Sequence, residues 1–267
     1  MGLLSLAMMV FMSWMFWLAI VFLEISAFTF PGIILFVVGG LGPTMVALFF
    51  NCLANRSVKQ FIDNLLSFKT IKTQHWIFII LFFPLVNIFS ALLAIVVGGV
   101  ETLDMQNLLQ VLKSPLSFMT YSLIVLILGP IPEEIGWRGF AQPLMQHRYS
   151  VFKSSLIIGL FWMIWHIPLF IIDGYPLSAI SFLSVEFVIY CLSILALSVI
   201  IGWLFNQTKF SVASAILAHY ASNYWGGLVP SNTLSDFFRL VFLLITTYYL
   251  WKYNSLTSYK QILPKQP

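Results

Sequence analysis

The sequence predicts an all-α protein that crosses a membrane several times. Hydrophobic residues make up 60% of its 267 residues, charged residues make up only 8%, and the mean hydropathy is +0.97. Apolar runs recur from one end of the chain to the other, and a helix needs about 20 residues to cross the hydrocarbon core of a bilayer. This composition excludes a soluble globular domain. We therefore expect one membrane domain over residues 1–267, with the lipid bilayer as a partner and no role for nucleic acid.

Eight segments approach the length of a spanning helix, in this order: 3–23, 32–50, 76–98, 115–130, 154–172, 178–204, 210–227 and 235–251. The first segment has no basic stretch before it and no cleavage site of small residues, so we expect a retained span rather than a signal peptide. Segment 131–148 belongs to none of these eight segments. Because Pro130 and Pro132 interrupt helical hydrogen bonding where the fourth run ends, we expect a short helix there, at or dipping into the cytoplasmic half of the membrane.

The distribution of lysine and arginine predicts the orientation of the chain. If both termini are cytoplasmic, the outer stretches hold only Lys113 and Arg239, and Arg138 belongs to the short helix. The inner stretches then hold all the other cations, which are Arg56, Lys59, Lys69, Lys72, Arg148, Lys153, Lys209, Lys252, Lys260 and Lys265. Such an excess on one side is typical of the cytoplasmic face, so we expect an integral, multi-pass protein with both termini in the cytoplasm.

The short helix concentrates scarce charges beside an apolar run, where ionisable groups are costly and mark candidate functional sites. Glu134 and Arg138 are four residues apart, so on a helix they share a face and form a favourable ion pair. Glu133 is rotated about 100° away, and its own neighbour four residues on is Trp137, so this helix offers it no cation. A carboxylate in that position is suited to act as a general base, although a glutamate facing the membrane surface is the simpler alternative.

Two further polar groups lie in apolar segments. His166 is surrounded in sequence by apolar residues and needs a partner, which in the simplest case is a carbonyl of a neighbouring helix. His219 and Asn223 are four apart and share a face of a segment rich in alanine and serine. Small residues predict close helix packing, which directs both polar groups toward the bundle interior, where they form part of a site or a hydrogen-bonded pair between helices.

Together these groups form a complete set for hydrolysing an amide with water. A carboxylate supplies the base, a histidine orients the water or another group, and an amide donates to the oxyanion. The sequence lacks the signatures of rival chemistries, namely HExxH, GxSxG, a glycine-rich phosphate loop and CxxC, and Cys52 and Cys191 have no metal-ligand spacing.

The same residues resemble the CPBP intramembrane endopeptidases, the family of CAAX prenyl proteases and bacteriocin-processing or immunity proteins. The three family motifs occur in the family's order: EExxxR at Glu133, Glu134 and Arg138; an aromatic residue followed four residues later by histidine at Trp162 and His166; and HxxxN at His219 and Asn223. The motif-bearing core covers residues 115–227. The aromatic residue is commonly phenylalanine in the family, whereas this chain has Trp162.

The resemblance implies an intramembrane endopeptidase that cleaves a membrane-anchored or lipidated substrate, with prenylated CAAX proteins among the candidates. It divides three tasks among the motif residues: water activation by Glu133 and His166, oxyanion stabilisation by His219 and Asn223, and support of the site by Glu134, Arg138 and Trp162.

The cofactor requirement is open at this point. If a metal is present, Glu133, His166 and His219 would form a three-ligand zinc site with an open position for water. The amide of Asn223 is a poor zinc ligand and a good oxyanion donor, so we favour a glutamate mechanism that requires no cofactor.

Two alternative functions remain. One is a catalytically idle member of the family that acts as a scaffold or bacteriocin-immunity factor. The other is a proton-coupled transporter in which Glu133, the histidines and Glu186 relay protons. We expect Glu186 to lie well inside the sixth span, where it either makes a structural hydrogen bond or lines a path for substrate or water.

Overall fold

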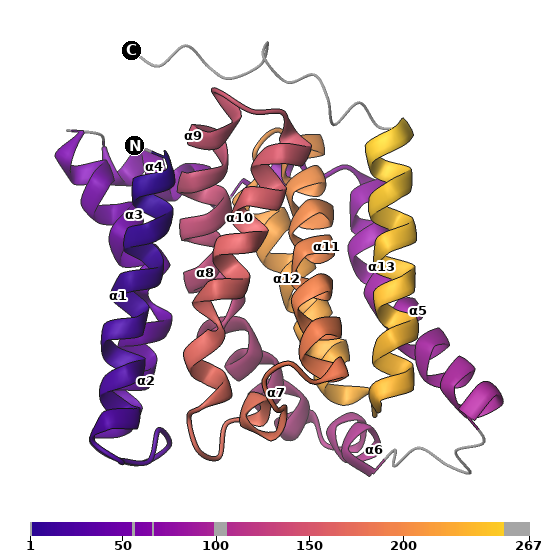
Figure 1. Cartoon of the computed structure of the whole chain (residues 1–267). Coiled ribbons are helices and arrows are strands. Elements are labelled where there is room, and N and C mark those ends of the chain that lie inside the picture. The colour runs from indigo at the N-terminus through magenta and orange to yellow at the C-terminus, as the bar shows by residue number, and fades with distance from the viewer. Residues whose placement is uncertain (1, 55–56, 66, 99–105, 254–267) are drawn as a thin grey trace.

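A computed structural model describes residues 2–54, 57–65, 67–98 and 106–253, and every regular element within them is helical. The long helices run side by side, and the start of the first and the end of the last lie at the same end of the bundle (Figure 1). The helices are α1 (Gly2–Phe22), α2 (Gly32–Gly40), α3 (Gly42–Leu53), α4 (Val58–Leu65), α5 (Thr73–Gly98), α6 (Gln106–Lys113), α7 (Pro115–Leu128), α8 (Pro130–Gly136), α9 (Gln142–Gln146), α10 (Val151–Trp165), α11 (Val185–Gln207), α12 (Val212–Leu228) and α13 (Thr233–Tyr253). The all-α prediction is confirmed.

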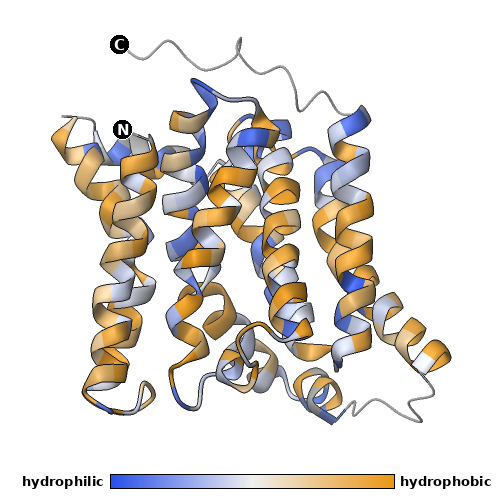
Figure 2. Ribbon diagram, in the orientation of Figure 1, coloured by the Kyte–Doolittle hydropathy of each residue, from blue (hydrophilic) through white to orange (hydrophobic). Residues whose placement is uncertain are grey.

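Six helical stretches of the described residues are long and apolar enough to span a membrane, and a bent pair raises the number to seven. The bent pair is α2 with α3, which meet at 55° and divide the segment predicted as one span over 32–50. Helix α12 occupies the segment predicted as 210–227, but its 17 residues are too few for it to be counted. Hydrophobic residues follow the long helices, and hydrophilic ones gather toward the two ends of the bundle (Figure 2). The protein is thus an integral membrane protein, while the predicted count of eight spans is not confirmed.

The sixth predicted span begins later than expected. Residues Pro176–Ala179 form a separate 3-10 turn, and α11 starts at Val185, where the Ser184 hydroxyl caps the helix by accepting from the Phe187 N–H. The expectation that Glu186 lies well inside a span is therefore wrong. Glu186 stands in the first turn of α11, where the helix dipole favours a carboxylate, and it accepts a hydrogen bond from the Thr233 hydroxyl at 2.7 Å.

Segment 131–148, which belongs to none of the eight predicted spans, continues the preceding apolar run. After a break at Gly129, α8 is followed by a π-helical turn, Trp137–Ala141, and by α9, so that Pro115–Gln146 forms one long apolar stretch. The short helix that carries the acidic pair is present as α8. It lies inside the bundle and packs against α3 and α12, which places its polar side chains in the protein interior.

Close approach of α8 to α3 depends on Gly136. A Cβ atom built on Gly136 would lie 2.7 Å from the backbone carbonyl oxygen of Pro43, closer than side-chain carbons approach backbone atoms. A glycine at this position therefore allows the two helices to touch, and the contact fixes the position of Glu133 and Glu134 along the bundle axis.

Candidate active site

The predicted ion pair of the EExxxR motif is present and buried. Glu134 and Arg138 are both 0% exposed, and the Arg138 guanidinium donates to Glu134 Oε1 at 2.9 Å. Its other terminal nitrogen donates to the hydroxyl of Ser198 on α11 at 3.0 Å and to the Ser198 carbonyl at 3.3 Å. A buried ion pair is favourable only when further hydrogen bonds satisfy its remaining donors and acceptors, and Ser198 supplies two of these.

The same carboxylate connects to the HxxxN motif on α12. His219 Nδ1 lies 2.9 Å from Glu134 Oε1, and Asn223 Nδ2 lies 3.0 Å from His219 Nε2. The neutral imidazole with its proton on Nδ1 satisfies both contacts, since it donates to the carboxylate and accepts from the amide. The result is a hydrogen-bonded chain from Arg138 through Glu134 and His219 to Asn223. His219 is buried, while Asn223 is exposed.

Glu133 occupies the position predicted for a carboxylate without a cation. It is 5% exposed, and its Oε2 accepts a hydrogen bond from the indole nitrogen of Trp162 at 2.5 Å. The other oxygen, Oε1, faces a small space beside Gly129. A methyl group built on Gly129 would lie 3.5 Å from Glu133 Oε1 and 3.5 Å from Asn223 Nδ2. The carboxylate and the amide therefore border the same space.

His166 lies at the C-terminal end of α10 and bonds within its own helix. Its Nδ1 donates to the Trp162 carbonyl at 2.8 Å, which leaves Nε2 as an acceptor. The Trp162 ring packs against both histidines, with ring centroids 5.9 Å from His166 and 4.9 Å from His219. Within the described part of the chain no hydrogen bond joins His166 to Glu133, so a water molecule would have to connect them.

The zinc alternative does not fit the side chains as they are placed. Among residues 2–54, 57–65, 67–98 and 106–253, no three His, Cys, Asp or Glu side chains are grouped as a metal ion requires. In addition, both ring nitrogens of His219 already make hydrogen bonds, and the Glu133 carboxylate accepts a hydrogen bond from Trp162. We therefore assign no step to a metal, and the metal-free mechanism stays a prediction.

Several neighbours of the site were not singled out in the sequence. Ser198 was detectable, because it is a polar residue deep in an apolar span, whereas Gly129 carries no side chain that would point to chemistry. Tyr190 packs edge-on against His166 with ring centroids 5.7 Å apart. Tyr175 lies in the loop before α11, where burial and the nearby charge of Glu133 raise its pKa to about 12, so its hydroxyl stays protonated. Only the packing of α10 and α11 reveals these two tyrosines.

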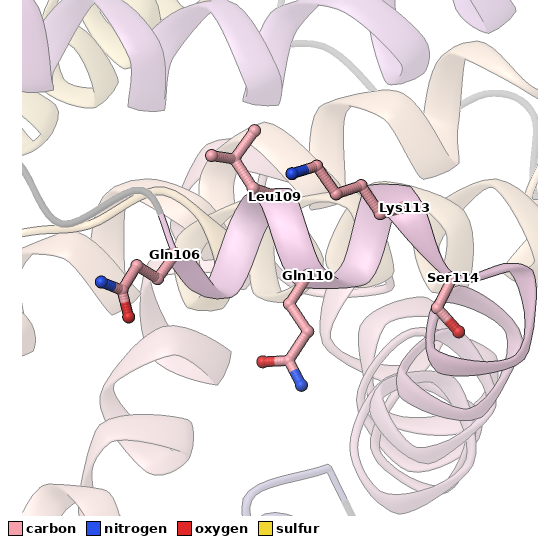
Figure 3. Close-up of a pocket in the computed structure, with 5 residues that line it drawn as sticks. All are labelled: Gln106, Leu109, Gln110, Lys113 and Ser114. Atoms are coloured by element: carbon pink, nitrogen blue, oxygen red, sulfur yellow. The ribbon is translucent and has the colours of Figure 1, made fainter.

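A separate pocket lies on α6 and is distinct from this site. Its lining residues are Gln106, Leu109, Gln110, Lys113 and Ser114 (Figure 3), none of which belongs to the three motifs.

Comparisons with known proteins find similarity over the same segment. The family described as "Type II CAAX prenyl endopeptidase Rce1-like" matches residues 115–225, the segment that carries all three motifs. A protein named CAAX prenyl protease 2, from Methanococcus maripaludis, is 34% identical over 173 residues. The match covers 63% of this chain and 62% of that relative, so the chain spans about three fifths of the relative's length. Through this segment the chain is similar to the Type II CAAX prenyl endopeptidase family and to a protein named CAAX prenyl protease 2.

Proposed function

We propose that the protein is an intramembrane endopeptidase that hydrolyses a peptide bond of a membrane-anchored or lipidated substrate. The observation that carries this proposal is that Glu133 Oε1 and Asn223 Nδ2 border the same small space beside Gly129. Attack of water on an amide requires a base for the water and a donor for the developing oxyanion, placed around one carbon atom. Prenylated CAAX-type proteins are the first substrates to test, because the relative is named a CAAX prenyl protease.

In the proposed reaction, Glu133 Oε1 accepts a proton from the attacking water, whose second hydrogen is directed toward the free Nε2 of His166. The water oxygen forms a bond to the scissile carbonyl carbon, and the carbonyl oxygen gains negative charge. The second N–H of the Asn223 amide, which His219 does not use, donates to that oxygen. Collapse breaks the carbon–nitrogen bond, and Glu133 returns its proton to the leaving amine.

This geometry gives His219 an orienting role. Its Nε2 accepts from Asn223, so in the neutral tautomer it has no N–H to offer an oxyanion. Glu134 fixes the tautomer through Nδ1, and Arg138 holds Glu134. These buried contacts thus orient the Asn223 amide. Oxyanion stabilisation, first expected of His219 and Asn223 together, is therefore assigned to Asn223 as the donor, with His219 holding it in place.

The exposure of the site residues indicates the direction from which a substrate approaches. Asn223 is exposed, whereas Glu133 and His219 are buried. Helix α7, which packs against α12, contains no buried residue and presents large apolar side chains such as Phe118 and Ile124. In a bilayer this surface contacts lipid, so we expect a lipidated peptide to approach Asn223 laterally, beside α7.

The proposal is tested with purified protein in lipid vesicles and three forms of one peptide: prenylated, acylated and unmodified. We expect the parent to cleave at least one lipidated form, and the variants Glu133→Ala and His219→Ala to lose this cleavage. Cleavage retained by either variant would contradict the assignment. A cellular effect that persists in Glu133→Ala would instead identify an idle scaffold.

A further inference from the structure

The indole of Trp162 contacts one side chain of each kind in the site: the carboxylate of Glu133, the guanidinium of Arg138 and the imidazole of His219. It is 1% exposed, and its nitrogen donates to Glu133. The guanidinium carbon of Arg138 lies 5.0 Å from the centre of its ring, and the ring meets His219 edge-on. A buried cation over an indole face and an edge-to-face ring contact both fix the orientation of that ring. The N–H of Trp162 is thus held in one direction.

The direction of this N–H determines which oxygen of Glu133 is available. Among the described residues, Glu133 has no cationic partner at hydrogen-bond distance, and its side chain makes one hydrogen bond, from Trp162 to Oε2. With Oε2 engaged, Oε1 is left facing the space that Asn223 borders. A donor to a carboxylate also favours its ionised form, which is the form that accepts a proton from water.

We propose that Trp162 is a positioning residue for the general base, because its indole N–H fixes the Glu133 carboxylate so that Oε1 points at the reacting space. This inference deepens the proposed function and rests on it for its kinetic consequences. The hydrogen bond requires the indole N–H. Phenylalanine at this position would keep an aromatic ring beside Arg138 and His219 but has no N–H.

The variant that isolates the N–H is Trp162→Phe. Because a misplacement of a reacting group by about 1 Å can cost about 10²-fold, we expect kcat to fall by about 10–100-fold. Because the contact matters to the base rather than to substrate binding, KM should stay within about twofold. The matched control is Trp17→Phe, which removes another buried indole N–H. That N–H donates to the Phe36 carbonyl at 3.0 Å, and the Trp17 ring packs on Trp165 rather than on a motif residue. A merely structural role predicts equal effects of the two variants on kcat and on melting temperature.

Infrared spectroscopy tests the same inference without any cleavage. Glu133→Gln removes one carboxyl band from the parent spectrum, which assigns that band to Glu133. In Trp162→Phe the assigned band should shift and broaden, since the carboxylate loses its donor and its single orientation, whereas in Trp17→Phe it should stay unchanged.

The two readouts separate the possible failures. A parent that cleaves none of the peptides would overturn the proposed function, and the infrared band would still decide whether Trp162 orients Glu133. An unshifted band in Trp162→Phe, or an unchanged kcat in a parent that cleaves, would overturn the positioning role.

Discussion

At the scale of single residues, the two adjacent glutamates have different roles because they have different hydrogen-bond partners. The Glu134 carboxylate accepts hydrogen bonds from Arg138 and His219, while among the described residues the Glu133 carboxylate accepts one only from the indole of Trp162. The sequence predicted the Glu134–Arg138 pair, because helix geometry alone brings residues four apart together. It did not predict the Trp162 contact, which joins residues 29 apart in sequence and depends on how the helices pack.

Replacement of Glu134 by glutamine should destabilise the protein severely. The change leaves the Arg138 charge buried and unpaired, which typically costs about 3–5 kcal/mol of unfolding free energy. The matched control is Asp236→Asn, which breaks the ion pair between Asp236 and Arg239. Both of these side chains are 26% exposed, so the change should cost about 1 kcal/mol of unfolding free energy or less. Thermal unfolding in detergent micelles measures both, and equal losses would show that the buried pair has no special role.

At the scale of helices, the site depends on breaks and close contacts between elements. The break at Gly129 lets α8 turn its acids toward α12, and Gly136 lets α8 touch α3. Some deviations from the predicted spans had signals in the sequence. The run Gly39-Gly40-Leu41-Gly42-Pro43 is typical of a helix break, and Ser184 is a typical N-cap. Hydropathy alone does not register these local signals, so α2 and α3 were merged and α11 was started too early.

Substitution of Gly136 by alanine should displace α8 from α3. The new methyl group overlaps the Pro43 backbone, and such overpacking typically costs about 1–3 kcal/mol. Cleavage should fall as well, since Glu133 and Glu134 move with α8. Gly40→Ala is the control, because a Cβ there has only the Leu128 carbonyl nearby, at 3.9 Å. Melting temperature and cleavage rate are measured for both, and a Gly136→Ala variant as stable and active as Gly40→Ala would refute the close-contact argument.

At the scale of the whole molecule, composition predicted the class of fold, and the motifs predicted the segment that the family model matches. Helix class and membrane insertion follow from the length of the apolar runs, which the bilayer constrains strongly. The number of spans does not follow in the same way, because a bent pair and a 17-residue helix are ambiguous by length. Convergence of α8, α10 and α12 on one site required the tertiary contacts.

The orientation of the bundle in the membrane stays a prediction that labelling can test. The first and last long helices begin and end at the same end of the bundle, which fits two termini on one side (Figure 1). The excess of lysine and arginine in the inner stretches predicts that this side is cytoplasmic. A cysteine introduced at Arg148, between α9 and α10, should react with an impermeant reagent only in permeabilised cells, whereas one at Asp173, between α10 and α11, should react in intact cells. The reverse pattern would invert the topology.

The most direct test of the account is hydrolysis of a prenylated peptide in water enriched in oxygen-18, with parent protein and Glu133→Gln compared by mass spectrometry. The account predicts that the parent places one labelled oxygen in the new carboxyl group. It also predicts that Glu133→Gln, which keeps the shape of the side chain but not its basicity, is slower by at least about 10²-fold. A Glu133→Gln variant that releases labelled product as fast as the parent would contradict the central claim that Glu133 activates the attacking water.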